Sequence, residues 1–201
     1  MEVLKFLIVF LIAYVIGSIP TGYIIVKLAK NQDIRKIGSG STGATNVKRV
    51  MGKKWFFIVM LLDAFKGALP VVLAQIFVGN ALFYGIAPVL AALGVIIGHS
   101  KSCFLGFTGG KSVASGVGTI LALSWQVGLL VALVWSIFTY FSKYVSVGSI
   151  VALSISPILM FAFHKPYAYI GYCLLGAIYI VYLHRENIKR LIKGEESKVR
   201  E

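Results

Sequence analysis

Long apolar runs separated by short polar or basic segments constrain the fold of this chain more than any other feature. The runs cover residues 3–28, 55–78, 81–98, 111–141, 145–163 and 167–184. An apolar α-helix of about 20 residues is long enough to cross the hydrocarbon core of a bilayer. With 58% hydrophobic residues and a mean hydropathy of +0.87, the chain is too apolar for a soluble domain of 201 residues. The sequence therefore predicts an all-α integral membrane protein.

The run 111–141 decides the number of crossings, because its one polar interruption is Ser124-Trp125-Gln126. As one helix it gives six crossings and puts the basic segment 30–54 and the basic C-terminal tail on opposite sides. With a turn at Ser124 it gives seven crossings, and every strongly basic segment then lies on one side, as the positive-inside rule favours. We expect seven transmembrane helices in a single domain, 1–201, with the N-terminus outside and the C-terminus cytoplasmic. The expected spans are approximately 3–28, 55–78, 81–98, 111–124, 126–141, 145–163 and 167–184.

The 20 Lys and Arg residues outnumber the 7 Asp and Glu residues, but they lie between apolar runs. A cytoplasmic membrane surface explains this placement better than nucleic acid does. The two cysteines, Cys103 and Cys173, are far apart and flanked by apolar residues, so they predict neither a disulfide framework nor a metal site. The first apolar run has no basic leader and no small-residue cleavage site, and we interpret it as a retained helix.

Two apolar runs contain residues that are unfavourable in a membrane helix unless the surrounding protein satisfies them. Gly17-Ser18-Ile19-Pro20 breaks the first run, and a freed carbonyl there has to be satisfied by protein or a polar cavity, so the bend is expected to face the interior. A plain kinked anchor is the alternative. Asp63 and Lys66 are three positions apart in the second run and share a helical face. They are either functional charges or a structural lock.

The segment Gly38–Arg49 is the longest stretch without a bulky apolar residue other than Val47. Its glycines let backbone N–H groups turn toward a ligand, and its hydroxyl, amide and basic side chains can hold a phosphate. It matches neither the Walker loop nor the dinucleotide fingerprint. A phosphate site and a flexible cytoplasmic loop are both open. The candidate residues are Gly38, Ser39, Gly40, Ser41, Gly43, Thr45, Asn46 and Arg49.

Three further polar clusters fall on the same predicted side. Gly109-Gly110-Lys111 leads into a helix start and is a second candidate anion site. Ser146 and Ser149 share one face of the sixth span; we expect Ser146 to serve helix packing, and for Ser149 packing and ligand contact are both open. His184 and Asn187 can point the same way after the last span, whereas His164 is expected to be only interfacial. The tail from Lys189 onward is expected to lie on anionic lipid headgroups.

No Ser-His-Asp spacing, carboxylate pair or metal-ligand cluster stands out among these clusters. Their common property is the ability to hold oxyanions.

Together these residues resemble a known family, the bacterial membrane glycerol-3-phosphate acyltransferases that use acyl phosphate, the PlsY family. The resemblance covers nearly the whole chain, and the motifs that carry it occur in one order. They are Gly17-Ser18-Ile19-Pro20, Gly38-Ser39-Gly40, Gly43-Ala44-Thr45-Asn46 with Arg49, Gly98-His99, Phe104-Leu105-Gly106-Phe107 with Gly109-Gly110-Lys111, and His184-Arg185-Glu186-Asn187-Ile188. The family fold has seven helices and an outside N-terminus, in agreement with the charge distribution.

The resemblance implies transfer of an acyl group from acyl phosphate to the 1-hydroxyl of sn-glycerol 3-phosphate, giving lysophosphatidic acid and phosphate. It implies that Ser39, Arg49, Lys111, His184 and Asn187 are catalytic, that Gly109, Gly110 and Lys111 form the glycerol-phosphate loop, and that Glu186 is structural. This sequence departs from the family pattern at Ser41, where Asn is usual, at Ser112, where Gly is usual, and in Ser100-Lys101-Ser102-Cys103. These departures bear on the fine geometry of phosphate contact, and Lys101 is an alternative ligand.

The implied partners are acyl phosphate, glycerol 3-phosphate, membrane lipid and an upstream enzyme that makes acyl phosphate, with no cofactor, metal or nucleic acid. The expected location is the bacterial plasma membrane, with the active site at the cytoplasmic face. Either His184 or a substrate phosphate oxygen takes the proton of the attacking hydroxyl, and the substrate is favoured because the resemblance supplies no Asp to orient the histidine. A small anion transporter and a structural protein that recruits anionic lipid are the rival hypotheses.

Overall fold

A computed structural model describes residues 2–78 and 85–199, which are mostly helical. Its α-helices, with two short 3-10 turns η1 (Ile34–Lys36) and η3 (Cys103–Leu105), are α1 (Glu2–Ser18), α2 (Thr21–Lys30), α3 (Ala44–Met51), α4 (Lys53–Phe77), α5 (Ile86–Ser100), α6 (Val113–Leu123), α7 (Trp125–Ser142), α8 (Val145–Ala162), α9 (Tyr167–Leu183) and α10 (Arg185–Ile192). The predicted all-α fold is confirmed.

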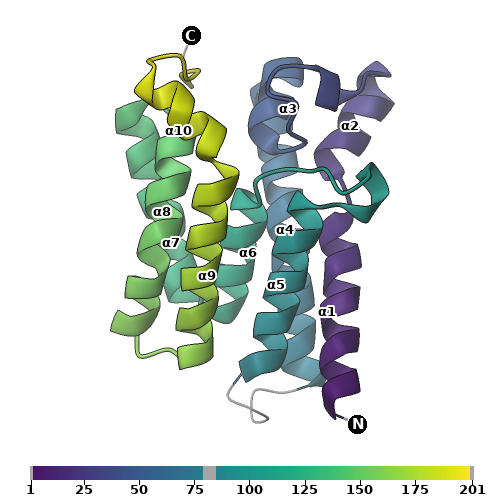
Figure 1. Ribbon diagram of the computed structural model, residues 1–201, viewed down its shortest axis with the longest axis vertical. Helices are drawn as coiled ribbons and strands as arrows, with labels where there is room; N and C mark the ends of the chain where they lie inside the picture. Colours follow the sequence, from purple (N-terminus) through teal and green to yellow (C-terminus); the bar gives the residue numbers. More distant parts are fainter. Residues whose placement is uncertain (1, 79–84, 200–201) are drawn as a thin grey trace.

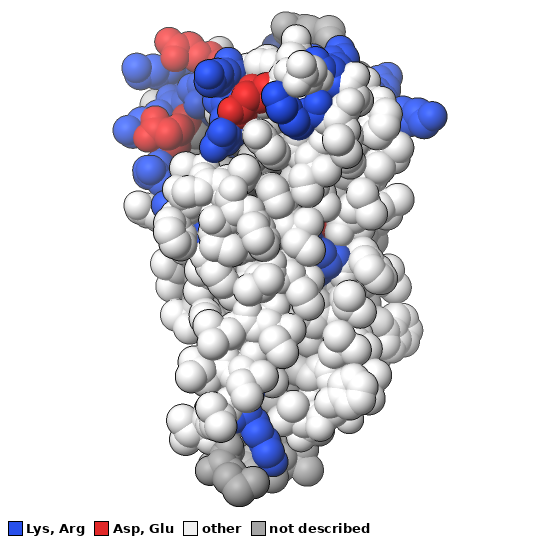
Figure 2. Space-filling view, turned by 90° about the vertical axis from the view of Figure 1, so that its right-hand side faces the viewer, with Lys and Arg blue, Asp and Glu red and all other residues white. Residues whose placement is uncertain are grey.

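The long helices form one bundle with two halves (Figure 1). Helices α1, α4 and α5 make one half, α7, α8 and α9 make the other, and α6 lies between them. Helices α2, α3 and α10 gather at one end of the bundle, beside the C-terminus, and the N-terminus lies at the opposite end. On the face shown in Figure 2, most of the charged side chains gather at the end that carries α10, and the rest of this face is largely uncharged.

Four helical segments are long and apolar enough to cross a membrane: Val3–Lys30, Lys53–Phe77, Trp125–Ser142 and Val145–Ala162. A fifth is formed by α9 together with α10, which are bent by 56° relative to each other. Helices α5 and α6 are apolar but shorter. The expected third span, 81–98, begins at Ile86 in the structure, and its first residues, 81–84, as well as the expected turn at 79–80, lie outside the described residues.

The run 111–141 is divided into two helices, because α6 ends at Leu123 and α7 begins at Trp125. Lys165 donates a hydrogen bond to Gln126 over 3.4 Å, so this break lies beside the connection between α8 and α9. The division occurs where the sequence predicts a turn. The number of crossings stays a prediction.

Glycines bring pairs of helices into close contact. A Cβ on Gly98 of α5 would lie 2.3 Å from the Tyr14 carbonyl oxygen of α1, and a Cβ on Gly118 of α6 would lie 2.0 Å from the Ala64 carbonyl oxygen of α4. Only glycine permits these approaches. Membrane helices pack largely through such small residues, since lipid supplies no hydrophobic drive for them to associate.

The break between α1 and α2 faces the interior, as predicted. Lys66 donates to the Ile19 carbonyl over 2.7 Å and also lies 2.7 Å from the Asp63 carboxylate. Thr21 donates a second hydrogen bond to Asp63, and His99 lies 3.7 Å from it. The two buried charges therefore join α4 to the break, as the structural alternative expects.

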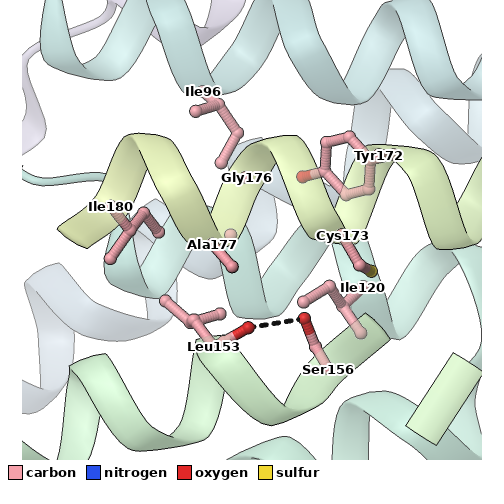
Figure 3. Close-up of a pocket in the computed structure, with 10 residues that line it drawn as sticks. Ile96, Ile120, Leu153, Ser156, Tyr172, Cys173, Gly176, Ala177 and Ile180 are labelled. Atoms are coloured by element: carbon pink, nitrogen blue, oxygen red, sulfur yellow. Dashed lines mark hydrogen bonds between the residues drawn. The ribbon is translucent and has the colours of Figure 1, made fainter. Parts of the chain in front are cut away.

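A small crevice in the core lies between α8, α9 and the neighbouring helices (Figure 3). Its volume is about 10 Å³, room for roughly one water molecule. Ser156 donates to the Leu153 carbonyl over 2.8 Å, and the Tyr172 and Thr119 hydroxyls bond at 2.5 Å. These polar groups are satisfied locally, so the crevice is a packing feature.

Candidate active site

One large cavity lies at the charged end of the bundle, below α3 and α10, and has a volume of about 640 Å³. Its polar part is lined by Ser39, Ser41, Gly43, Thr45, Asn46, Lys48, Arg49, Asp63, His99, Lys111, Ser146, Ser149, His184, Asn187 and Arg190. Its apolar part is lined by residues of α4, α6 and α7, including Phe56, Met60, Leu61, Val113, Val117, Leu121 and Trp135. All four polar clusters of the sequence thus meet in one place.

The first glycine loop is held in shape by the buried side chain of Asn46. The Asn46 amide donates to the carbonyls of Ile34, Ile37 and Ser41 over 3.3, 2.9 and 2.9 Å, and its oxygen accepts the Ser39 N–H over 3.1 Å. Every polar atom of this side chain is therefore engaged. Asn46 acts as an organiser of the loop and leaves ligand contact to its neighbours.

Helix α3 begins at the cavity, after Gly43, and no side chain caps its first N–H groups. Such an uncapped N-terminus attracts an anion. Ser39, Thr45 and Arg49 line the cavity nearby. No hydrogen bond or ion pair engages the Arg49 guanidinium among residues 2–78 and 85–199. This part of the site is open to a phosphate.

Four predicted phosphate-contact residues lie behind the lining. Gly38 and Gly40 have positive φ angles of 61° and 70° and shape the first loop. Gly109 and Gly110 pack on His99: a Cβ on Gly110 would lie 2.1 Å from His99 Nε2. The glycines at 109 and 110 therefore allow close packing of the second loop, and this packing delivers Lys111 to the cavity.

Lys111 lies in the connection before α6 and donates a hydrogen bond to the Asn187 side-chain oxygen. Burial lowers the pKa of Lys111 to about 8, the Arg190 and Arg49 charges act in the same direction, and Glu196 opposes them. An anion bound beside Lys111 would raise this pKa again by offsetting the neighbouring cations.

His184 lies at the bend between α9 and α10, and its Nδ1 is 2.8 Å from the Ile180 carbonyl oxygen. A carbonyl only accepts, so Nδ1 carries the hydrogen and the neutral ring keeps its lone pair on Nε2. A backbone carbonyl thus orients this histidine in the way that an Asp partner would.

The hydroxyl of Ser146, and not that of Ser149, contacts an anionic group, the carboxylate of Glu196. Ser146 donates to Glu196 Oε1 over 2.8 Å. Ser149 donates to the Val145 carbonyl over 2.7 Å and accepts from Trp135 Nε1 over 3.2 Å, so its hydroxyl is engaged within the protein.

The sequence analysis missed three residues of the site: Ser146 as a polar contact, Arg190 and Glu196. Arg190 follows Asn187 by three residues, and helical spacing alone would have placed both on one face of α10. The tail was expected on lipid headgroups, but residues 189–192 continue α10 and Glu196–Val199 line the cavity. Lys101 is not among the lining residues. Among the described residues no group of three His, Cys, Asp or Glu side chains is placed to hold a metal ion.

The family model of glycerol-3-phosphate acyltransferase matches residues 7–194 of this chain. The chain belongs to the glycerol-3-phosphate acyltransferase family. A relative from Synechococcus sp. (strain JA-3-3Ab), named glycerol-3-phosphate acyltransferase, is 45% identical over 92% of this chain and 89% of its own length.

Two crystal structures of PlsY (YgiH), an integral membrane glycerol 3-phosphate acyltransferase, share the fold of this family member. Its glycerol 3-phosphate form superimposes with a TM-score of 0.90 at 37% identity, over 96% of this chain and 94% of that chain. Its lysophosphatidic acid form gives a TM-score of 0.87 at 35% identity over the same shares. The resemblance found in the motifs is confirmed, and the chain is an integral membrane protein of the PlsY type.

Proposed function

We propose that this protein transfers an acyl group from acyl phosphate to the 1-hydroxyl of sn-glycerol 3-phosphate, releasing lysophosphatidic acid and phosphate. The observation that carries the proposal is the large cavity, which joins a cationic, hydroxyl-rich part to an apolar part between helices. A reaction between a lipid-like anion and a small water-soluble anion needs both. The names of the curated relative and of the two crystal structures support glycerol 3-phosphate as the acceptor and lysophosphatidic acid as the product.

The cationic part would hold two phosphate groups side by side. Arg49, Lys111 and Arg190 line it together with the first N–H groups of α3. Two substrate anions repel each other, and fixed cations and N–H dipoles offset this repulsion without having to reorganise. Holding both reactants in line supplies an effective molarity of up to about 10⁵ M or more.

The proposed roles follow the positions of the side chains. Ser39, Arg49, Lys111, His184 and Asn187 carry catalysis, and Ser41, Gly43 and Thr45 contact phosphate. Gly38, Gly40, Asn46, Gly109 and Gly110 shape the two loops, and Ser149 braces Trp135. The acyl chain would lie along the apolar lining from α4, α6 and α7.

In the chemical step the 1-hydroxyl oxygen attacks the acyl carbonyl, and the carbon–oxygen bond to phosphate breaks. Phosphate is a good leaving group in such a mixed anhydride, so no enzyme nucleophile is required. His184 Nε2 takes the hydroxyl proton, because the Ile180 carbonyl fixes the required tautomer. This revises the preference for the substrate phosphate that the sequence alone favours.

We further propose seven membrane crossings, the five long helical segments and the two short ones, with the N-terminus outside. The active site then faces the cytoplasm at the inner surface of the bacterial plasma membrane, where an enzyme that makes acyl phosphate can supply the donor.

The test uses the purified protein in liposomes with radiolabelled glycerol 3-phosphate and, in parallel, acyl phosphate or an acyl thioester as donor. We expect lysophosphatidic acid and inorganic phosphate to appear in equal amounts with acyl phosphate, and no product with the thioester. If product formed with the acyl thioester and not with acyl phosphate, the proposed donor would be wrong. Labelled glycerol 3-phosphate that enters the liposomes unchanged would favour the transporter.

A matched pair of variants ties the activity to the cavity. Lys111→Met removes a cation that lines the cavity, and Lys54→Met removes one at the exposed start of α4. We expect kcat/KM to fall at least about 100-fold in the first variant, as for loss of one electrostatic group, and to stay unchanged in the second.

A further inference from the structure

The segment that follows α10 turns back over the cavity. Gly194 has a φ of 73°, a left-handed conformation that reverses the chain after Ile192. The Glu195 N–H donates to the Arg190 carbonyl over 2.8 Å and fixes this reversal. Residues Glu196–Val199 then line the cavity. We call residues 195–199 the strap.

The Glu196 carboxylate occupies a site built for an oxyanion. Oε1 accepts from Ser146 Oγ over 2.8 Å and from Asn187 Nδ2 over 2.5 Å, and Oε2 accepts from Arg190 Nε over 2.7 Å. The Glu196 side chain is only 6% exposed. Asn187 also accepts from Lys111, so this carboxylate is bound to the same group of side chains as the proposed phosphates.

The strap is fastened at its far end by backbone contacts. Lys48 of α3 donates to the Val199 carbonyl over 2.8 Å, and the Val199 N–H donates to the Lys143 carbonyl over 2.7 Å. The strap thus spans from α10 to α3 and to the connection between α7 and α8. Each of these contacts is one hydrogen bond to a backbone carbonyl, and single hydrogen bonds contribute little enough net stability for the strap to open reversibly.

We propose that the strap is an internal competitor of the substrates: Glu196 occupies a phosphate position, and the strap leaves the cavity when a phosphate binds there. Identifying the displacing ligand as a substrate rests on the proposed function; the displacement by a phosphate does not. Without substrate, the clustered cations Arg190, Lys111 and Arg49 repel each other, and Glu196 offsets part of this repulsion. A phosphate dianion brings more charge and more acceptor oxygens to the same donors.

The strap follows residue 194, where the match to the family model ends. The proposed competition therefore involves residues beyond that match. A substitution in the strap can therefore alter this competition without altering the residues proposed to carry catalysis.

Binding measured without an acyl donor tests the proposal, with inorganic phosphate and glycerol 3-phosphate as probes in calorimetry on the full chain in detergent. Glu196→Gln removes the charge that binds Arg190. Glu195→Gln removes the same charge from an exposed neighbour whose side chain is outside the lining. A chain that ends at Gly194 removes the whole strap.

If the closed strap is about 90% populated, opening it permanently tightens apparent phosphate binding about tenfold. We expect this tightening in Glu196→Gln and in the shortened chain, and none in Glu195→Gln. Weaker binding in the first two variants would make Glu196 part of the binding site and overturn the proposal. Equal effects of both Gln variants, or no effect of any, would overturn it as well.

A distance measurement separates failure of this proposal from failure of the proposed function. Spin labels at Ser197→Cys and Lys54→Cys, in a Cys103→Ser background, report the position of the strap. We expect inorganic phosphate to lengthen this distance, and sodium chloride at equal ionic strength to leave it unchanged. An equal response to both salts would show screening of the Glu196–Arg190 pair instead of displacement, and no response to phosphate would likewise refute the proposal. Either result stands whether or not acyl transfer is observed.

Discussion

His184 is held by one hydrogen bond whose direction is fixed by chemistry, and this makes its role testable. With Nδ1 donating to Ile180, Nε2 is the only ring nitrogen that can accept a proton. If it accepts the substrate proton, His184→Gln lowers kcat about 10²- to 10⁴-fold. It also removes the acid side of the pH profile of kcat, which reflects protonation of the imidazole.

Steady-state kinetics across pH check this prediction. A positioning role would instead raise KM for glycerol 3-phosphate, with kcat and its pH profile retained. That result would indicate that a phosphate oxygen of the substrate, and not His184, accepts the hydroxyl proton. The thermal unfolding temperature of the variant serves as the control for a folding defect.

At the scale of single residues, the sequence identifies chemical types well and contacts poorly. It selects Lys111, His184 and Asn187 because basic and amide groups beside glycine-rich segments suit an oxyanion. It favours Ser149 over Ser146 as a ligand contact, whereas in the structure the Ser146 hydroxyl donates to Glu196 and the Ser149 hydroxyl is engaged by Trp135. The sequence does not contain these distances. It also cannot show that Gly110 packs on His99, because that contact joins two elements.

Among the helices, close packing at glycine leads to a matched prediction. Gly118→Ala would force a Cβ to within 2.0 Å of the Ala64 carbonyl oxygen, so α4 and α6 must separate. We expect a loss of about 1–3 kcal/mol, as for other overpacked sites. Gly171→Ala on α9 meets nothing within 4 Å, and we expect no loss there.

Thermal unfolding in detergent, followed by circular dichroism, compares the two variants. Both make the same chemical change within a helix, so helix propensity cancels between them. An equal unfolding temperature for both variants would contradict the view that α4 and α6 are joined by close backbone contact.

The helix breaks were predictable because they depend on local chemistry. Polar residues at Ser124–Gln126 and the proline at position 20 interrupt apolar runs, and the structure places both breaks there. The 56° bend after α9 and the return of the strap were not predictable. The return of the strap depends on the Glu196 carboxylate meeting Arg190 and Asn187 across space, and periodicity contains no information on such a contact.

For the whole molecule, one charged end and the long apolar helices define how it can lie in a bilayer (Figure 2). The cavity opens at the end where the basic residues gather, and a positive field there raises the local concentration of anionic substrates. On the proposed function, the same residues would serve both orientation in the membrane and capture of substrate.

Three lysines at separate places in the chain provide the test of this orientation. Lys5 lies near the N-terminus, Lys165 in the connection between α8 and α9, and Lys193 directly after α10. Each is replaced by Cys in a Cys103→Ser background, since Cys103 is exposed and Cys173 is buried. An impermeant maleimide is then applied to intact spheroplasts and to permeabilised ones.

Seven crossings place Lys5→Cys and Lys165→Cys outside, where they react in intact spheroplasts, and Lys193→Cys inside, where it reacts only after permeabilisation. Six crossings would place Lys5→Cys on the same side as Lys193→Cys, because an even number returns the chain to its starting side. A complete reversal of the labelling pattern would keep seven crossings but put the cavity outside. Acyl phosphate made in the cytoplasm could not reach the cavity there. A reversed labelling pattern would therefore contradict both the proposed donor and the proposed orientation.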